Sequence, residues 1–400
     1  MFRLARPAAI AAAAVACVFN VNVPIRAAEV QTKAGPVNVE PLAQLDNPWG
    51  MTFLPDGRLL ITEKPGRLRV FENGELSEPI GGVPKVAYRQ QGGLLDVEID
   101  PNFKENQLVY LSYAEPAEQQ PPGTKDTIDP RLGNFFKGDD PQIKAGAVAR
   151  AKLDGNQLTG LKVIWRQVPQ TVGRGHFGGR LIFAPDGKLF ILSGERQRFE
   201  PAQDPQSNLG AVVRINPDGS IPQDNPFVNK EGHRPDLYTK GNRNPLGGAI
   251  YPETKELWIN EMGPKGGDEL NVIKPGKNYG WPLVAVNAVH YNDAPIPPHE
   301  SRPEFEEPIY AWTPVISPSG MIFYGQSLFP DWKGNAFIGG LSSRALVRLK
   351  VEGGKVTEEE KINMGFRVRD VIESPDGAIL LLSDGPKGEL LRLTPARPAK

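Results

Sequence analysis

The sequence predicts an all-β protein, a six-bladed β-propeller with four-stranded antiparallel blades, and three observations support this prediction. A pattern of an apolar residue, a turn built on Pro or Asp-Gly, and a β-rich run occurs six times. Several copies continue across a hairpin-like joint, and Asp-Gly between apolar runs is a strong hairpin signal. The chain has 400 residues, more than the roughly 250–300 residues of one core, and a closed ring of repeats avoids that limit because each unit packs mainly on its neighbours.

The six copies place the blades along the chain. Their turns lie at residues 54–57, 101–103, 184–187, 251–252, 329–331 and 374–377, and the runs that follow are RLLITE, QLVYLSY, KLFILSG, ELWINEM, GNAFIGG and AILLLSD. Second strands follow in some copies, as GRLRVF at 66–71, RALVRLKV at 344–351 and GELLRL at 388–393. Six copies predict six blades around a central channel, and we find no helical periodicity after the N-terminal segment.

We expect residues 29–400 to form a single propeller domain. Residues 116–145 are polar, rich in Pro, Gly and Asp, and lack periodicity, so they predict a surface loop that could form a lid over one face. A second long segment outside the repeats covers residues 287–308. The strand expected at 37–45 should pair into the last blade and close the ring, because an open ring would leave exposed edges.

The first 28 residues are typical of a secretory signal peptide. Arg3 and Arg6 precede an Ala-rich apolar run at 8–18, and two small residues follow at 27–28. This run is shorter than the about 20 apolar residues that span a bilayer, and we find no other candidate. We therefore expect a periplasmic or secreted protein with no integral membrane segment in the mature chain. A lipid anchor at Cys17 and a plain N-terminal membrane anchor are the alternatives.

Charge and cysteine content exclude some classes of protein. The formal net charge is −1 and no basic patch stands out, which argues against nucleic acid as a partner. Cys17 is the single cysteine, so an intrachain disulfide is excluded.

The segment GRGHFGGRL, residues 173–181, places His176 among four glycines directly before a predicted strand. Glycine allows tight turns and a close approach of a ligand to the backbone. An imidazole in this setting can act as a general base near neutral pH. A hydrogen-bonded structural histidine is the alternative interpretation of this residue taken alone.

Four further segments carry polar residues that interrupt the repeats. GNRNP contains Arg243, whose planar fork suits carboxylates. The loop EMGPKGGDELN, residues 261–271, offers exposed carbonyls and carboxylates of the kind that suit Ca²⁺, although its spacing is not that of an EF-hand. Arg367 and Arg369 are two apart in a predicted strand, so they share a face and need an anion. RQQGG ends with Gln91 before a double glycine. Ordinary loop or edge residues are the alternative in each case.

In this order, the segments resemble the soluble PQQ-dependent aldose sugar dehydrogenases, relatives of soluble glucose dehydrogenase. The resemblance covers about residues 47–393. It rests on nine segments in the family's order: NPWGMTFLPDGRLLITE, QQGGLLDVEIDP, GHFGGRLIFAPDG, LGAVVRINPDGSIP, GNRNPLGG, EMGPKGGDELN, PGKNYGWP, SPSGMIFY and RVRDVIESPDG.

The resemblance implies oxidation of an aldose at its anomeric carbon to a lactone, with PQQ and Ca²⁺ as cofactors. It implies that His176 takes the proton of the anomeric hydroxyl while hydride passes to the C5 carbonyl of PQQ. Gln91 and Arg243 complete the implied catalytic set. The residues implied to bind PQQ are Arg243, Asn244, Arg367, Arg369 and Gln91, and the carbonyls implied to hold Ca²⁺ belong to Gly263 and Pro264. The physical chemistry agrees, because a polycarboxylate needs cations and a metal on a quinone oxygen polarises it.

Two positions depart from the family pattern. Gly175 stands where soluble glucose dehydrogenase has an aspartate before the histidine, so we expect no oriented carboxylate beside the base. Ser342 stands where the family often has a PQQ-binding lysine, and Arg344 is the substitute that the sequence offers.

Two other functions remain open at this point. A metal-dependent lactonase on a six-bladed propeller would use the loop at 261–269, and a non-catalytic binding propeller would explain the departures at Gly175 and Ser342. The sequence does not name the aldose or the electron acceptor, and it leaves monomer and homodimer equally open.

Overall fold

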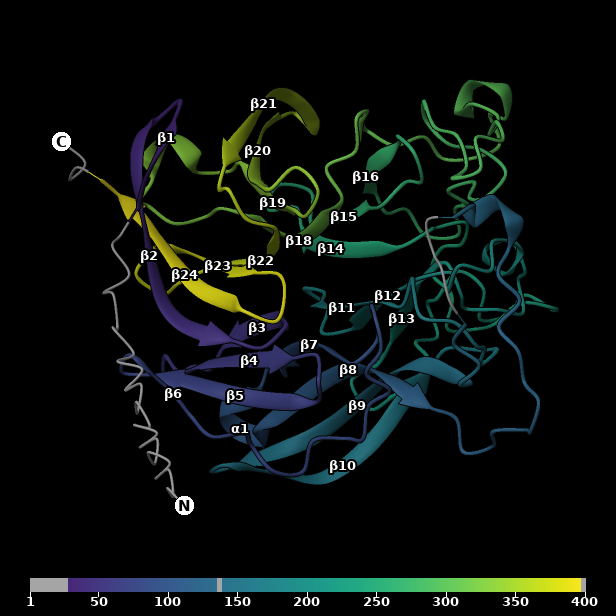
Figure 1. Ribbon diagram of the computed structural model, residues 1–400, viewed down its shortest axis with the longest axis horizontal. Coiled ribbons are helices and arrows are strands. Elements are labelled where there is room, and N and C mark those ends of the chain that lie inside the picture. Colours follow the sequence, from purple (N-terminus) through teal and green to yellow (C-terminus); the bar gives the residue numbers. More distant parts are fainter. Residues whose placement is uncertain (1–27, 135–138, 397–400) are drawn as a thin grey trace, which may run out of the picture.

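The computed structural model describes residues 28–134 and 139–396, which form a ring of six antiparallel sheets (Figure 1). The innermost strand of each sheet faces the central channel, and these six strands are β3 (Pro48–Phe53), β7 (Leu94–Ile99), β11 (Gly178–Phe183), β14 (Pro245–Ile250), β18 (Pro318–Phe323) and β22 (Val368–Glu373). Each packs on the next, and β22 packs on β3. The predicted six-bladed propeller is confirmed.

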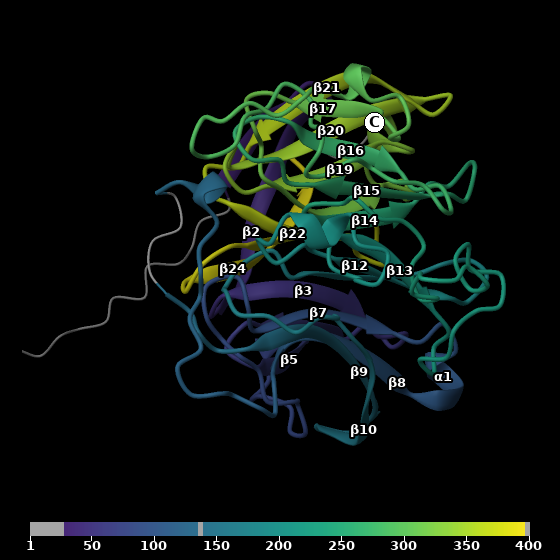
Figure 2. The ribbon, with the colours of Figure 1, turned by 90° about the vertical axis from the view of Figure 1, so that its right-hand side faces the viewer.

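The outer strands complete the blades. Blades one and two add β4 (Leu59–Glu63), β5 (Arg67–Glu72), β6 (Glu75–Leu76), β8 (Leu108–Pro116), β9 (Lys144–Asp154) and β10 (Gln157–Arg166). Blades three and four add β12 (Leu189–Ser193), β13 (Ala211–Ile215), β15 (Leu257–Glu261), β16 (Asp268–Val272) and β17 (Tyr310–Trp312). Blades five and six add β19 (Ala336–Gly340), β20 (Ala345–Glu352), β21 (Lys355–Asn363), β23 (Ile379–Ser383) and β24 (Gly388–Pro395). In Figure 2, blade three lies between blade two below and blade four above.

The N-terminal strands close the ring as expected. β2 (Gly35–Leu45) pairs antiparallel with β24, and β1 (Ala28–Thr32) pairs with β2, so the last sheet has five strands. Blade three has only three strands, with one isolated bridge between Val213 and Leu237 in place of a fourth. The segment before Leu237 carries Pro222, Pro226 and Pro235, and proline has no N–H to donate to a ladder.

In residues 28–134 and 139–396, helical structure is confined to single turns between strands. These are α1 (Phe103–Asn106) and the short 3₁₀ segments Pro130–Leu132, Glu200–Ala202, His299–Ser301 and Pro330–Trp332. The segment between β8 and β9 contains the first of these 3₁₀ turns. It is tied to the loop after β12, because Arg198 donates to the Asp126 carboxylate at 2.6 Å and to the Thr127 carbonyl at 3.0 Å.

The repeated Asp-Gly turns form one structure in three blades. The amides of Gly57, Gly187 and Gly377 each donate to the carbonyl three residues earlier at 2.9 Å. All three glycines have positive φ values, between +77° and +92°, a conformation that side-chain-bearing residues rarely adopt. The pattern that marked the repeats in the sequence is therefore the turn that joins the innermost strand to its neighbour.

Hydrophobic residues pack between blades. Six buried clusters fill the six boundaries: Leu60 with Val109, Tyr110 with Ile191, Leu192 with Ile259, Trp258 with Ile338, Phe337 with Leu381, and Leu382 with Ile61 mark them in turn. Each blade contributes to two clusters. The hydrophobic core at each boundary therefore involves only two sheets, even in a chain of this length.

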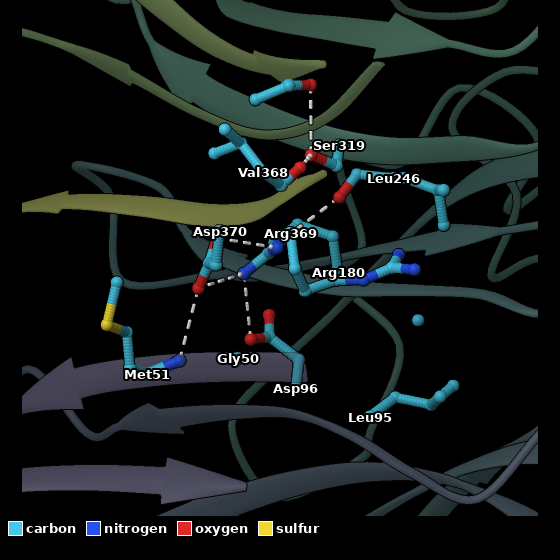
Figure 3. Close-up of polar contacts among 12 residues, drawn as sticks. Gly50, Met51, Leu95, Asp96, Arg180, Leu246, Ser319, Val368, Arg369 and Asp370 are labelled. Carbon is cyan, nitrogen blue, oxygen red and sulfur yellow. Dashed lines mark hydrogen bonds and ion pairs between the residues drawn. The ribbon is translucent and has the colours of Figure 1, made fainter. Parts of the chain in front are cut away.

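Arg180 on β11 crosses the channel and joins blades that are not neighbours (Figure 3). Its guanidinium donates at 2.9 Å to Asp96 of blade two and at 2.9 Å to Asp370 of blade six. Its Nε donates to the Leu246 carbonyl of blade four at 3.1 Å. Gly50 and Gly320 leave the room for these carboxylates, because a Cβ at either glycine would lie within 2.3 Å of an Asp oxygen.

Polar bonds near the channel link every blade to the next. In each bond a side chain or amide of one blade donates to an oxygen of a neighbouring blade. The pairs, donor first, are Thr62 and the Leu95 carbonyl, Ser112 and the Gly179 carbonyl, Arg180 and the Leu246 carbonyl, Asn260 and the Ser319 carbonyl, Ser319 and the Val368 carbonyl, and the Met51 amide and the Asp370 carboxylate. The ring is thus closed by buried hydrogen bonds as well as by apolar packing.

We predict that Arg180→Ala lowers the free energy of unfolding by about 3–5 kcal/mol, because it leaves the buried Asp96 and Asp370 carboxylates facing each other without a cation. Urea unfolding measures the loss. Arg58→Ala removes an arginine paired with the exposed Asp56 and should cost about 1 kcal/mol or less. Equal losses in the two variants would contradict the role given to Arg180.

Candidate active site

A cavity of about 290 Å³ opens at the channel end where the innermost strands begin. Its lining residues are Trp49, Lys64, Gln91, His176, Phe177, Gly178, Arg243, Asn244, Leu246, Met262, Tyr291, Ser317, Leu341, Ser342, Arg367 and Arg369. All the residues predicted to be catalytic or to bind PQQ are therefore in one cavity. A larger cavity, of about 680 Å³, lies around the other ends of the same strands and contains none of them.

The loop that carries His176 has a fixed shape. His176 has a φ of +50°, and a Cβ at Gly178 would lie 2.3 Å from the Leu192 carbonyl oxygen. The buried Arg196 guanidinium donates to the carbonyls of Gly173 and Gly175 at 2.8 and 3.1 Å. Its central carbon lies over the Phe177 ring, 3.8 Å from the ring centroid. Burial, reinforced by nearby Arg198, lowers the pKa of Arg196 to about 9, which leaves it cationic at neutral pH.

His176 is paired with Glu195, which follows β12. The distance from His176 Nδ1 to Glu195 Oε1 is 2.5 Å, and both side chains are almost completely buried. Glu195 Oε2 accepts hydrogen bonds from the amides of Arg198 and Phe199 at 2.6 and 2.7 Å. A carboxylate with this many donors is held in one orientation, so Glu195 fixes the plane of the imidazole.

The charge states of this pair follow from their surroundings. Burial and the charge of Arg243 lower the pKa of His176, against the opposing effect of Glu195. Burial alone would raise the pKa of Glu195, but His176, Arg243 and the Phe199 amide together lower it. At neutral pH the carboxylate is ionised and the ring is neutral, with its proton on Nδ1. The lone pair of the ring is then on Nε2, which is the nitrogen that can accept a proton.

Gln91 positions the same loop from blade two. Its Oε1 accepts from the His176 amide at 2.7 Å, and its own amide donates to the Arg174 carbonyl at 3.2 Å. Gln91 and His176 therefore lie together, although they are 85 residues apart in the chain.

Arg243 is buried beside the cavity and is held by backbone oxygens. One terminal nitrogen donates to the carbonyls of Met262 and Gly263, each at 2.8 Å. The guanidinium lies 5.0 Å from the Trp281 ring centroid. Its Nε is buried and has no hydrogen-bond partner within the described residues. Asn244, next in the chain, accepts from the Gly178 amide at 3.3 Å.

Arg367 and Arg369 share one anion, Asp384. Arg367 Nε donates to Asp384 Oδ2 at 2.9 Å, and Arg369 donates to Oδ1 at 2.8 Å. The two arginines lower the pKa of Asp384 far below its usual value despite its burial. The pair of cations that the sequence places on one strand face therefore presents one net positive charge to the cavity.

The loop of Gly263 and Pro264 lies next to the cavity rather than in it. Both residues line a small adjoining space together with Arg243, Glu261 and Glu269. The Gly263 carbonyl already accepts from Arg243, which shows that this oxygen faces a cation. Burial and the neighbouring Glu269 raise the pKa of Glu261 to about 7.

Two expectations about the departures need correction. We expected no oriented carboxylate beside the base because Gly175 lacks one, but Glu195 provides it from β12. A Cβ at residue 175 would lie 2.4 Å from the end of the Gln197 side chain, so an aspartate there would require Gln197 to move. Arg344 does not replace the missing lysine, because it is exposed and does not line the cavity.

The sequence reasoning missed Glu195, Asp384 and Lys64. The antiparallel pairing of residues in each hairpin is the signal that could have identified them. Pairing of Gly178 with Ser193 places residue 176 opposite 195, and pairing of Val368 with Ser383 places 367 opposite 384. By the same argument Pro48 with Glu63 places Lys64 at the cavity end of blade one.

The fold and the cavity together define a propeller with a cation-rich pocket and an imidazole–carboxylate pair at one mouth of its channel. A sequence model of the glucose/sorbosone dehydrogenase family matches residues 45–392. The aldose sugar dehydrogenase YliI of Escherichia coli is 40% identical over 368 residues, which cover 90% of this chain and 93% of the relative. The chain therefore belongs to the glucose/sorbosone dehydrogenase family.

Solved structures agree with this assignment. The soluble aldose sugar dehydrogenase of Escherichia coli, in its apo form, superimposes with a TM-score of 0.80 at 37% identity, over 90% of this chain and 99% of that one. The PQQ-bound form of an aldose sugar dehydrogenase from Streptomyces coelicolor gives a TM-score of 0.68 at 25% identity, over 90% and 98%.

The structure describes almost none of the residues to which the N-terminal predictions apply. The signal peptide and Cys17 fall outside the described residues, apart from Ala28 at the start of β1. Within residues 28–134 and 139–396, the helices are all too short to cross a bilayer.

We predict that His176 makes the stability of the protein depend on pH. Because its folded pKa lies below the unfolded value of about 6.5, protonation favours the unfolded state, and stability is lost as pH falls from about 6.5 toward the folded pKa. The stability of the unsubstituted protein relative to His176→Asn should therefore decrease between about pH 8 and about pH 5.5 in urea unfolding.

His233→Asn changes a histidine outside the cavity and serves as the control. A stability difference between the unsubstituted protein and His176→Asn that stays constant over this pH range would show that the folded protein does not disfavour the charged form of His176.

Proposed function

We propose that this protein is a PQQ-dependent aldose sugar dehydrogenase that oxidises the anomeric carbon of an aldose to a lactone, with His176 as general base. The observation that carries the proposal is one cavity in which the Glu195-bound imidazole faces a set of cationic side chains. A base and an anion site in one cavity suit a sugar next to a polycarboxylate cofactor. The named relatives support the same reaction.

The cavity residues fit PQQ. Arg243, Arg367 and Arg369 bring positive charge to one small space, and the buried Nε of Arg243 lacks a hydrogen-bond partner in the described chain. A buried donor without a partner costs free energy, and an anionic ligand would remove that cost. Asn244 adds an amide, and Trp49, Leu246 and Met262 add apolar contact for a planar ring system.

His176 is the proposed proton acceptor. Its Nε2 would take the proton of the anomeric hydroxyl, and ionised Glu195 would stabilise the imidazolium that forms. Gln91 would keep the backbone of residue 176 in place through its bond to that amide. When bound, PQQ would supply the quinone that accepts the hydride from the sugar.

Ca²⁺ belongs to the proposal, with the carbonyls of Gly263 and Pro264 as ligands. Carbonyl oxygens suit this ion, and Gly263 and Pro264 line a small space that they share with the acidic residues Glu261 and Glu269. These residues would hold the ion at the edge of the cavity, where it could polarise a bound carbonyl.

We also propose that residues 1–28 are a signal peptide, that residues 29–400 are the catalytic propeller, and that the protein acts in the periplasm or after secretion. Lipid attachment at Cys17 is the alternative form of its N-terminus. The electron acceptor is unassigned, and size measurement in solution would decide between monomer and homodimer.

The test is reduction of an artificial electron acceptor by purified protein with PQQ, Ca²⁺ and a panel of aldoses. We predict activity with at least one aldose. His176→Ala should lower kcat by roughly 10²–10⁴-fold, and Glu195→Gln should lower it by a smaller factor, since the ring keeps its position but loses the charge that stabilises the imidazolium.

His233→Ala alters a histidine that does not line the cavity and is the control, expected to keep activity. No dye reduction with any aldose, or full activity in His176→Ala, would contradict the proposal. Lactone hydrolysis without PQQ would favour the lactonase alternative, and PQQ binding without turnover would favour a binding propeller.

A further inference from the structure

Lys64 is a cavity residue for which the proposed reaction has no assigned role. It directly follows β4, the second strand of blade one, and within the described chain it is the one lysine that lines the cavity. Its Nζ donates to the Gln90 carbonyl at 3.0 Å. An ammonium carries three donors, so two remain for a ligand in the cavity.

The position of Lys64 has counterparts at or beside the cavity in three other blades. The residue directly after the second strand is Met262 in blade four, Leu341 in blade five and Asp384 in blade six. Met262 and Leu341 line the cavity, and Asp384 binds the two cavity arginines. The repeat therefore places this position at the cavity wall, and blade one fills it with a cation.

Lys64 lies close to other positive charge. Burial and the charges of Arg369 and Arg367 lower its pKa, and Asp384 only partly offsets them. Because Asp384 neutralises one of the two arginines, this side of the cavity keeps an excess of positive charge when Lys64 is protonated. Like charges this close repel each other unless an anion lies among them.

The neighbours of Lys64 show which ligand class would relieve the repulsion. Ser342 in blade five presents a hydroxyl and no charge to the same cavity. Among the described residues, none of the side chains that line this cavity is acidic. An external carboxylate in this cavity would accept charge-assisted hydrogen bonds from Lys64, and such bonds are stronger than neutral ones.

We propose that Lys64 binds a carboxylate of the quinone cofactor and is required for its affinity. This inference rests on the proposed function. Lys64 also bonds to Gln90, whose neighbour Gln91 holds the His176 amide. The lysine thus links the cofactor end of the cavity to the loop that carries the base.

The experiment measures PQQ affinity by equilibrium dialysis and by the shift in Tm, both with Ca²⁺ and without substrate. Lys64→Gln should raise the Kd for PQQ by roughly 10- to 100-fold, the range for a lost charged hydrogen bond, and should reduce the Tm shift. Lys64→Arg keeps the charge and should retain most of the affinity. Lys104→Gln removes a lysine at the other end of the channel and should bind PQQ like the unsubstituted protein.

The trimethyl ester of PQQ separates a direct bond from an indirect effect. If Lys64 contacts a carboxylate, the ester should bind the unsubstituted protein and Lys64→Gln equally weakly. Equal affinity of both proteins for PQQ itself would overturn the inference and leave the proposed function standing. Absence of PQQ binding by the unsubstituted protein would overturn the proposed function, and this inference with it.

Discussion

The ion triad of Arg180 with Asp96 and Asp370 is the constraint on which the rest of the molecule depends. Arg180 spans the channel from blade three and bonds to blades two, four and six (Figure 3). Buried charges of this kind are costly when unpaired, so the three strands that carry them have one relative position. A ring of six separate sheets acquires a fixed diameter at this level of the channel.

The residues of the candidate site lie on or just before the strands that carry the ion triad. His176 lies four residues before Arg180, and Arg369 directly precedes Asp370. Because side chains alternate along a strand, Asp370 points into the triad while Arg369 reaches Asp384 beside the cavity. The triad therefore sets the distance between the base on one side of the cavity and the cations on the other.

The repeats, the closing strand and the six blades could be predicted from the sequence because the signals are local. An Asp-Gly turn and the alternation around it lie within about ten residues of each other. The three-stranded blade could not be predicted in the same way, since Leu237 reaches Val213 across a proline-containing segment. The cavity residues were found through resemblance to a family, and the structure brings the six that are expected to bind sugar or PQQ into one space.

The partners of those residues were missed because they are distant in the chain and lie outside the segments that the sequence analysis singled out as functional. Glu195 is 19 residues from His176, in a segment with no motif of its own. Asp384 ends the repeat run AILLLSD, 17 residues from Arg367, and the need for an anion beside Arg367 and Arg369 was the signal that pointed to it. Lys64 was not singled out in the sequence, and the closed ring places it near the arginines of blade six.

The central claim is that one cavity holds the quinone between the cations and the Glu195-bound imidazole. A crystal structure of the protein with PQQ and Ca²⁺ tests it most directly. If PQQ binds as proposed, its density should lie in the cavity, with carboxylates at Arg369 and Lys64 and with His176 Nε2 facing the quinone carbonyls. Density for PQQ in the larger cavity at the other end of the channel, or His176 turned away from a bound quinone, would contradict it.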